Sequence, residues 1–285
     1  MKHSEDIPHP FLEVIIHNDS PLPGLTGLCA GFENGKWRDE DFAKHLFRWL
    51  PEFALKYSES ESLNKTNAVE KLEAAALNIF KSKKFESRGE FGELLLHAII
   101  RQVFKTVPAI SKIFYKDGPN DTVKGFDAVH VVCTDSDLEL WLGEVKFYKS
   151  ITKAITDVLD ELDKHTKTDY LRTEFSAITN KIDDSWPHAD KLKRLLHSNT
   201  SLDTIFTTIS IPVLLTYDSL TCKKHTCSDQ AYKDALKAEF VKHHNSFQTK
   251  LGASKLKVHL FLLPLNTKKD LIDALEKKLR IWQQI

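Results

Sequence analysis

The chain has 285 residues, of which 41% are hydrophobic and 28% are charged, a balance typical of a folded protein and not of a disordered one. Its 40 basic residues balance its 40 acidic residues, so no overall positive field indicates a nucleic-acid partner. A surface for DNA would therefore have to be a local patch.

The sequence carries no sign of export or of a membrane. Its amino terminus lacks the basic-then-apolar pattern of a signal peptide, and its apolar runs, such as VHLFLLPL, are too short to span a bilayer. The 4 cysteines are scattered, which favours reduced thiols over a disulfide framework. We therefore expect a cytoplasmic protein.

The pattern of the first part of the chain predicts a small α+β amino-terminal domain over residues 1–84, with a partner-binding or regulatory role. Residues 11–17 (FLEVIIH) form an apolar stretch, and a region rich in Pro and Gly over 21–35 indicates turns. A helical pattern follows over 39–55, and the polar segment 57–67 resembles a loop.

Residues 85–285 are predicted to form the second domain. A helix over 68–82 is expected at the end of the first domain, and the second domain is expected to begin with a helix from about Ser87 to Lys105, with Pro108 beyond its limit. Three strand-like segments rich in β-branched and aromatic residues come next, separated by DGPND and TDSD, and they span residues 109–116, 123–133 and 138–148. The short TDSD segment favours a hairpin between the last two.

The remainder alternates between helices and strands. Helices are expected over 150–165, 229–244 and 268–282, and nearly continuous apolar strands over 205–217 and 255–265. From residue 87 onward the order is therefore αβββαβ, followed by α-β-α, which predicts an α/β fold with a central mixed sheet flanked by helices.

The segment GEVKFYK carries the strongest chemical signal. Residues two apart on a strand share a face, so Glu144 and Lys146 are expected to project together. If TDSD turns the chain, the preceding strand is antiparallel and Asp127 comes level with Glu144. Two carboxylates converging there suit Mg²⁺, with Mn²⁺ as an alternative, and such a metal can activate water against a phosphodiester.

The helix before these strands adds carboxylates in GEFGELLLHA. Glu90 and Glu93 are three residues apart on one helix face, and Glu93, in the more apolar surroundings, is preferred as an extra metal ligand, with Glu90 as the alternative. His97 lacks the second histidine of a metalloprotease helix, so it is interpreted as a polar group on a packed helix. The Cys222-x4-Cys227 pair around His225 leaves a zinc site as a weaker alternative.

The acidic helix, the GFDAVHV strand and the GEVKFYK strand, in αβββαβ order over roughly residues 87–216, resemble the PD-(D/E)xK nucleases. The resemblance implies a restriction-endonuclease-like core. It implies that Asp127 is the first motif acid, that Glu144 and Lys146 are the (D/E)xK pair, and that Glu93 is the helix glutamate of many members. It also implies Mg²⁺-dependent hydrolysis of DNA, with Asp127, Glu144 and Glu93 as metal ligands.

The whole chain, including GLCAGFENGKW and HLFRWLPEFAL, further resembles the HamA family of nuclease subunits in the bacterial Hachiman anti-phage system. That resemblance implies a partner, the helicase HamB, which restrains the nuclease until DNA engages the helicase.

Two other functions remain open from the residues alone. One is a catalytically silent module that keeps the nuclease fold to hold a partner, and the other is a related phosphodiesterase that acts on RNA or nucleotides. Retention of Asp127, Glu144 and Lys146 together argues against the first. The metal chemistry does not separate DNA from RNA.

Overall fold

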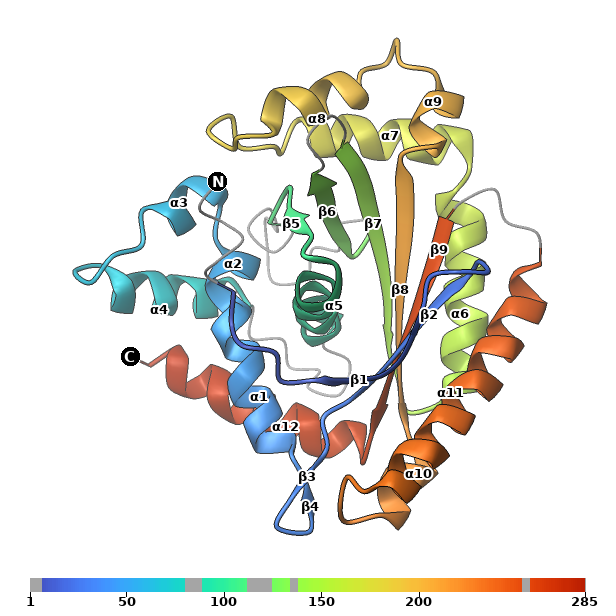
Figure 1. Ribbon diagram of the computed structural model, residues 1–285. Coiled ribbons are helices and arrows are strands. Elements are labelled where there is room, and N and C mark those ends of the chain that lie inside the picture. The colour runs from blue at the N-terminus through green and yellow to red at the C-terminus, as the bar shows by residue number, and fades with distance from the viewer. Residues whose placement is uncertain (1–6, 80–88, 112–124, 134–137, 253–256, 285) are drawn as a thin grey trace.

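The computed structural model describes residues 7–79, 89–111, 125–133, 138–252 and 257–284. Within them a seven-stranded mixed sheet separates two layers of helices (Figure 1). The mixed α/β class predicted from the sequence is confirmed, and no helix of the described residues is long and apolar enough to cross a membrane.

The strands of the main sheet follow the spatial order β1-β2-β9-β8-β7-β6-β5. Their bounds are Glu13–Asn18 (β1), Gly24–Cys29 (β2), Val107–Pro108 (β5), Ala128–Cys133 (β6), Leu138–Phe147 (β7), Ile209–Asp218 (β8) and Lys257–Leu265 (β9). A separate two-stranded ribbon consists of β3 (Phe32–Glu33) and β4 (Lys36–Trp37).

One face of the sheet is covered by helices from both ends of the chain. These are α1 (Asp39–Leu46), the 3₁₀ helix η1 (Phe47–Trp49), α2 (Leu50–Ala54), α4 (Ala68–Asn78), α5 (Gly89–Phe104) and α12 (Lys268–Trp282).

The other face is covered by helices from the second half of the chain. They are α6 (Ile151–His165), α7 (Thr168–Thr179), α8 (Ala189–Leu195), α9 (Leu202–Phe206), α10 (Leu220–Lys224) and α11 (Gln230–Leu251). A short helix, α3 (Tyr57–Glu61), lies at the start of the segment 57–67 that the sequence predicts as a loop.

The structure agrees with the expected hairpin but not with the first strand-like segment. Strand β5 comes before the expected span 109–116, whose residues 109–111 are not in a strand and whose remainder lies outside the described residues. Strands β6 and β7 are antiparallel, as expected for a hairpin, although the TDSD segment itself falls outside the described residues. Strands β7, β8, β9 and β2 run parallel to one another, and β1 is antiparallel to β2. The strands β8 and β9 are buried along almost their whole length, because helices cover both faces, as their continuous apolar sequences indicate. The sequence predicts one helix between β7 and β8, and the structure has three more there, α7, α8 and α9, after α6.

Strand β2 lies where the sequence predicts only turns. Its sequence GLTGLC is fully buried between β1 and β9. A Cβ at Gly27 would overlap the ring of Phe240, and one at Gly24 would overlap His259. The glycines that suggest turns in the sequence therefore allow close packing of neighbouring side chains on a buried strand.

The amino-terminal segment shares the sheet and the core with the rest of the chain. Strand β2 pairs with β9, and α1 packs against α12. A division of the chain at residue 84 remains a prediction about function, since the sheet includes strands from both sides of it.

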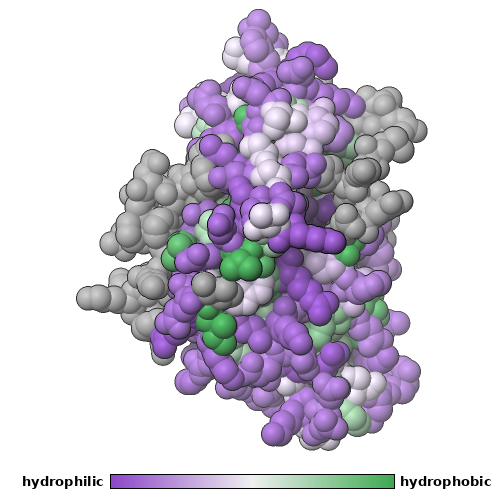
Figure 2. Space-filling model, turned by 90° about the vertical axis from the view of Figure 1, so that its left-hand side faces the viewer, coloured by the Kyte–Doolittle hydropathy of each residue, from purple (hydrophilic) through white to green (hydrophobic). Residues whose placement is uncertain are grey.

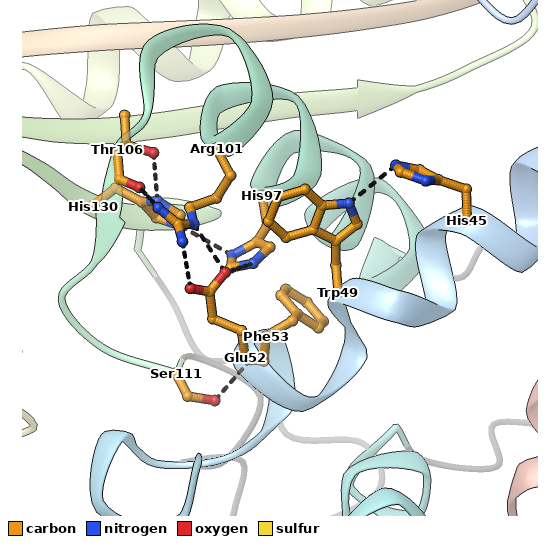
Figure 3. Close-up of polar contacts among 9 residues, drawn as sticks. All are labelled: His45, Trp49, Glu52, Phe53, His97, Arg101, Thr106, Ser111 and His130. Carbon is orange, nitrogen blue, oxygen red and sulfur yellow. Dashed lines mark hydrogen bonds and ion pairs between the residues drawn. The ribbon is translucent and has the colours of Figure 1, made fainter. Parts of the chain in front are cut away.

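A buried polar network fastens α2 to α5 and β6 (Figure 3). The Glu52 carboxylate accepts hydrogen bonds from His97 Nε2 at 3.0 Å and Arg101 Nε at 2.9 Å. His97 Nδ1 lies 3.2 Å from His130 Nε2, and His130 Nδ1 lies 2.9 Å from the Thr106 hydroxyl. Since a carboxylate only accepts, His97 donates its Nε2 hydrogen to Glu52. The two imidazoles and the Thr106 hydroxyl continue the chain of contacts to β6.

Burial and neighbouring charges shift the pKa values of this network. Burial alone would raise the pKa of Glu52, but His97 and Arg101 hold it below its usual value. Burial, with the nearby His97 and Arg101, lowers the pKa of His130 well below that of a free histidine. Within the network, Glu52 and Arg101 form an ion pair at 2.9 Å.

We predict that Glu52→Gln destabilises the protein by on the order of 3 kcal/mol, because it leaves the Arg101 guanidinium, only 4% exposed, without its counter-charge. Urea denaturation measures the loss. The double variant Glu52→Gln/Arg101→Met should recover part of it, since no uncompensated charge then remains buried. A double variant less stable than the sum of its single changes would contradict this account of the contact.

Candidate functional site

Glu144 and Lys146, the polar pair on β7, point to one face of the sheet. Leu140 and Leu142 pack into the core beneath α6, whereas Val145 and Phe147 pack into the core beneath α5. By the alternation of a strand, Glu144 and Lys146 share the face of Leu140 and Leu142, toward α6. Their exposed fractions are 1% and 7%, so both ionisable groups are buried.

Asp127 lies beside this pair, just before β6. Ala128 is level with Gly143, which sets Asp127 opposite Glu144 across the antiparallel pair. The Asp127 amide donates to the Gly143 carbonyl at 2.7 Å, and its carboxylate Oδ2 accepts from the Val145 amide at 2.9 Å. The Asp127 carboxylate is therefore fixed to the backbone of β7 between the two members of the polar pair.

Helix α6 supplies a partner for each member of the pair. Lys146 Nζ forms an ion pair with Glu161, and His165 Nδ1 lies 2.5 Å from Glu144 Oε1. Four residues of helix rise about 6 Å, and two residues of strand rise about 6.6 Å. Helix α6 runs opposite to β7, so the spacing of Glu161 and His165 matches that of Lys146 and Glu144.

Glu161 and His165 are functional candidates that sequence reasoning missed. The mixed charges of this helix are typical of a solvated face, which hides Glu161 among them, and its side chain is 37% exposed. The available signal was the i, i+4 spacing of Glu161 and His165 on the side of α6 that carries buried Ile155, Val158 and Leu162.

Aromatic side chains enclose the histidine. The rings of His165 and Tyr170 stack with centroids 4.4 Å apart, and Phe126 meets His165 edge-on at 5.3 Å. Burial lowers the pKa of His165, against the opposing effect of nearby carboxylates such as Glu161 and Asp127.

The negative charges of four carboxylates act on the Tyr170 phenol. Burial raises the pKa of its phenol well above the usual value, and the charges of Glu174, Glu144, Asp127 and Glu161 raise it further, in that order. The site therefore concentrates negative charge, which is the environment that favours a bound cation.

The structure places Glu93 on α5, the helix on the opposite face. Its neighbour Gly92 packs against Val145 and Phe147, the residues of β7 that point away from α6. Glu93 is itself buried, at 8% exposure, and Glu90 is partly buried. The role of either glutamate as a ligand stays a prediction, while Asp127, Glu144 and Lys146 lie together on adjacent strands.

The cysteines have ordinary packing roles in the described structure. Cys222 is buried, with its sulfur 3.4 Å from the Tyr232 hydroxyl, and burial raises the pKa of its thiol to about 11. Cys227 is exposed, and its thiol contacts Asp229. A thiol with a raised pKa is a poor zinc ligand, because the thiolate is the form that binds.

Fold and site together define a mixed α/β protein in which carboxylates, a lysine and a histidine gather beside the antiparallel strands β6 and β7, with Glu144 and Lys146 buried. The model of the family described as HamA matches residues 6–279, so the chain belongs to the HamA family. This membership indicates a role in anti-phage defence, in the context of the Hachiman system. Comparison with curated proteins gives no match.

The site depends on a glycine beside it. Gly125 has a φ of +122°, and a Cβ there would overlap the carboxylate of Glu174. We predict that Gly125→Ala lowers the free energy of unfolding by about 1–3 kcal/mol, from backbone strain and the displaced carboxylate. Denaturant unfolding measures it. Gly89→Ala, where nothing lies within 4 Å of the added Cβ, is the matched control and should change stability by less than about 1 kcal/mol. Equal effects at the two positions would contradict the prediction.

Proposed function

We propose that the chain is a metal-dependent DNA nuclease of the PD-(D/E)xK kind, acting in anti-phage defence with a helicase partner. The observation that carries the proposal is the placement of Asp127, Glu144 and Lys146 side by side on β6 and β7. The succession of α5, β5, β6, β7, α6 and β8 has the αβββαβ order of that core and supports the same fold assignment.

The donor set fits a hard divalent cation. Asp127 and Glu144 contribute carboxylate oxygens from adjacent strands, and the carboxylates of Glu161 and Glu174 add negative charge nearby. Mg²⁺ or Mn²⁺ takes such ligands, and Asp127, Glu144 and Glu93 are the residues that would hold it. When bound, the metal would activate water and stabilise the leaving oxygen of the phosphodiester.

Lys146 and the α6 side chains would prepare the site for the reaction. The Lys146 ammonium, paired with Glu161, would orient the nucleophilic water or offset the negative charge that develops on the phosphate. His165 holds one oxygen of Glu144 and so fixes the direction of the other. Glu161 and His165 are therefore positioning residues for the pair on β7.

A cleft with more basic than acidic side chains supports a nucleic-acid substrate despite the zero net charge. Beyond the end of β7, it is lined by Lys149 and, from α12, by Lys268, Lys269, Lys277 and Arg280 together with Asp273 and Glu276. Lys269 pairs with Asp273 and Lys277 with Glu40, which offsets part of the positive charge. Lys268 also places its ammonium 4.7 Å from the ring of Phe147, the last residue of β7. Clustered Lys and Arg side chains bind the phosphate backbone without regard to sequence.

We predict that Glu144→Gln and Lys146→Met each reduce Mg²⁺-dependent cleavage of plasmid and linear DNA by about 100-fold or more, because each removes a charge needed in the transition state. Cleavage is assayed with and without the helicase partner and ATP. Asp160→Asn, which removes an exposed carboxylate from α6, is the matched control and should retain activity.

The outcomes separate the competing functions. Cleavage that survives both substitutions in folded protein would show that the site is wrong. Cleavage of RNA in preference to DNA would identify the related phosphodiesterase. Absence of cleavage and of Mn²⁺ binding under every condition would favour the catalytically silent interaction module.

The amino-terminal segment is proposed to hold the helicase. Figure 2 shows that the face bearing α3 and α4 is mainly hydrophilic, with apolar side chains in a few separate groups. Val69 and Leu77 on α4 are 56% and 48% exposed, and Ile281 on the neighbouring α12 is 55% exposed. Exposed apolar side chains within a polar surround are typical of an interaction surface.

We predict that Val69→Asp/Leu77→Asp weakens binding to the helicase subunit at least about 10-fold, since charges would be placed in an apolar contact. Surface plasmon resonance with purified subunits measures the affinity. Leu220→Asp on α10, at a residue 69% exposed, is the control and should leave affinity unchanged. Binding by the double variant equal to that of the wild type would remove α4 from the proposed interface.

A further inference from the structure

Three side chains converge at the amino-terminal edge of the sheet, apart from the carboxylate site. His17 is on β1, Asp19 follows that strand, and His259 is on β9, with β2 between the two strands. Asp19 Oδ2 lies 3.4 Å from His17 Nε2, and Asp19 Oδ1 lies 3.4 Å from His259 Nδ1. One donor atom from each residue can be chosen so that all lie within 4.8 Å of one another.

These separations suit a tetrahedral metal ion. With metal–ligand bonds of about 2.0–2.1 Å, two ligand atoms of a tetrahedral zinc site lie about 3.3 Å apart. The two distances from Asp19 to the imidazole nitrogens are close to that value. Because one donor atom from each residue lies within 4.8 Å of the others, the atoms need to approach by at most about 1.5 Å to bind one ion.

A single hydroxyl orients both imidazole rings. Thr26 Oγ1, on β2, lies 2.8 Å from His17 Nδ1 and 2.7 Å from His259 Nε2. Thr26 is fully buried, and its hydroxyl oxygen can accept a hydrogen bond from each ring. That arrangement leaves a lone pair on His17 Nε2 and on His259 Nδ1, the two nitrogens nearest Asp19. Metal-binding histidines are held in this way through their second nitrogen.

The contacts with Asp19 favour a bound cation. The two imidazoles hydrogen-bond to Thr26 at 2.8 and 2.7 Å, whereas their contacts with Asp19, at 3.4 Å, are ion-pair distances. When both rings donate to Thr26, each turns a lone pair toward the Asp19 carboxylate, which is a repulsive arrangement. A metal ion bound by the two rings and Asp19 would remove this repulsion. The rival solution is a proton on one of the histidines.

The surroundings leave room for an ion and keep the rings in place. The side chains of His17 and Asp19 are 38% and 61% exposed, which opens the site to solvent, whereas that of His259 is 7% exposed. Phe104 packs edge-on against the His259 ring at 4.9 Å. A Cβ at residue 24 would overlap His259 Nδ1, so Gly24 keeps this donor atom accessible.

We propose that His17, Asp19 and His259 form a binding site for Zn²⁺ or a transition-metal ion of similar softness, with water as the fourth ligand. Two imidazoles and one carboxylate are a donor set that suits zinc, whereas the all-carboxylate set beside β7 suits Mg²⁺. The ion joins the edge strand β1 to β9 across β2, and so stabilises the amino-terminal strands on the sheet. This site is independent of the proposed nuclease activity.

The test uses the full chain carrying Glu144→Gln, so that the carboxylate site does not dominate metal binding. Zn²⁺ alone is titrated by calorimetry, and Co²⁺ is added as a spectroscopic probe. We expect one equivalent of Zn²⁺ to bind, Co²⁺ to give the intense visible bands of a four-coordinate site, and Zn²⁺ to raise the unfolding temperature.

Variants of the exposed ligands locate the binding. His17→Gln and Asp19→Asn should each weaken Zn²⁺ binding at least 10-fold without loss of fold, and Thr26→Val should weaken it about 10- to 100-fold by releasing the rings. His197→Gln, at an exposed histidine elsewhere, is the matched control and should bind Zn²⁺ normally. Absence of Zn²⁺ binding at micromolar concentration, or binding unaffected by both His17→Gln and Asp19→Asn, overturns the proposal. The latter result would assign the zinc to other residues, such as Cys222 and Cys227.

Discussion

The burial of β7 on both faces is the constraint on which the rest of the structure depends. Its odd-numbered side chains pack under α5, and its even-numbered side chains pack under α6. Glu144 and Lys146 belong to the even set, so they are carried into the interior with their charges. A buried ion costs several kcal/mol unless it is paired, and α6 meets that requirement with His165 and Glu161. The position and direction of α6 are therefore tied to the chemistry of the strand.

The same sheet joins the amino-terminal segment to the rest of the core. Strand β2 lies against β9, and Glu52 of α2 reaches His97 and Arg101 of α5. Because the Glu52 charge balances Arg101 inside the protein, α2 cannot leave α5 without exposing or unpairing a charge. A partner that binds near α4 would therefore act on a segment that is coupled to α5 and, through α5, to the odd face of β7.

Local patterns in the sequence predict the central part of the fold well and its edges poorly. Alternation and turn chemistry locate β6 and β7 and place Asp127 level with Glu144, because these features depend on neighbours in the chain. The strand β2 is not predicted, because its glycines are required by close contact with Phe240 and His259, which are more than 200 residues away in the sequence. Glu161 is misinterpreted for a similar reason: the charge pattern of α6 does not reveal which face meets β7. The placement of Glu93 depends on how α5 packs, which its apolar sequence leaves open on almost every side.

The contacts that compensate the buried charges also bear on how the proposed activity is controlled. His165 contacts an oxygen of Glu144, and Glu161 pairs with Lys146, so the two groups on β7 have partners from α6 in the protein alone. A cation at Glu144 would compete with His165 for the carboxylate, and a phosphate at Lys146 would compete with Glu161 for the ammonium. The position of helix α6, and of the Tyr170 ring stacked on His165, then decides whether Glu144 and Lys146 stay paired with α6 or can bind a metal ion and a phosphate. Any partner that moves α6 or α7 by a small amount would change that balance without touching the carboxylates, because both histidine and glutamate reach the strand from that single helix.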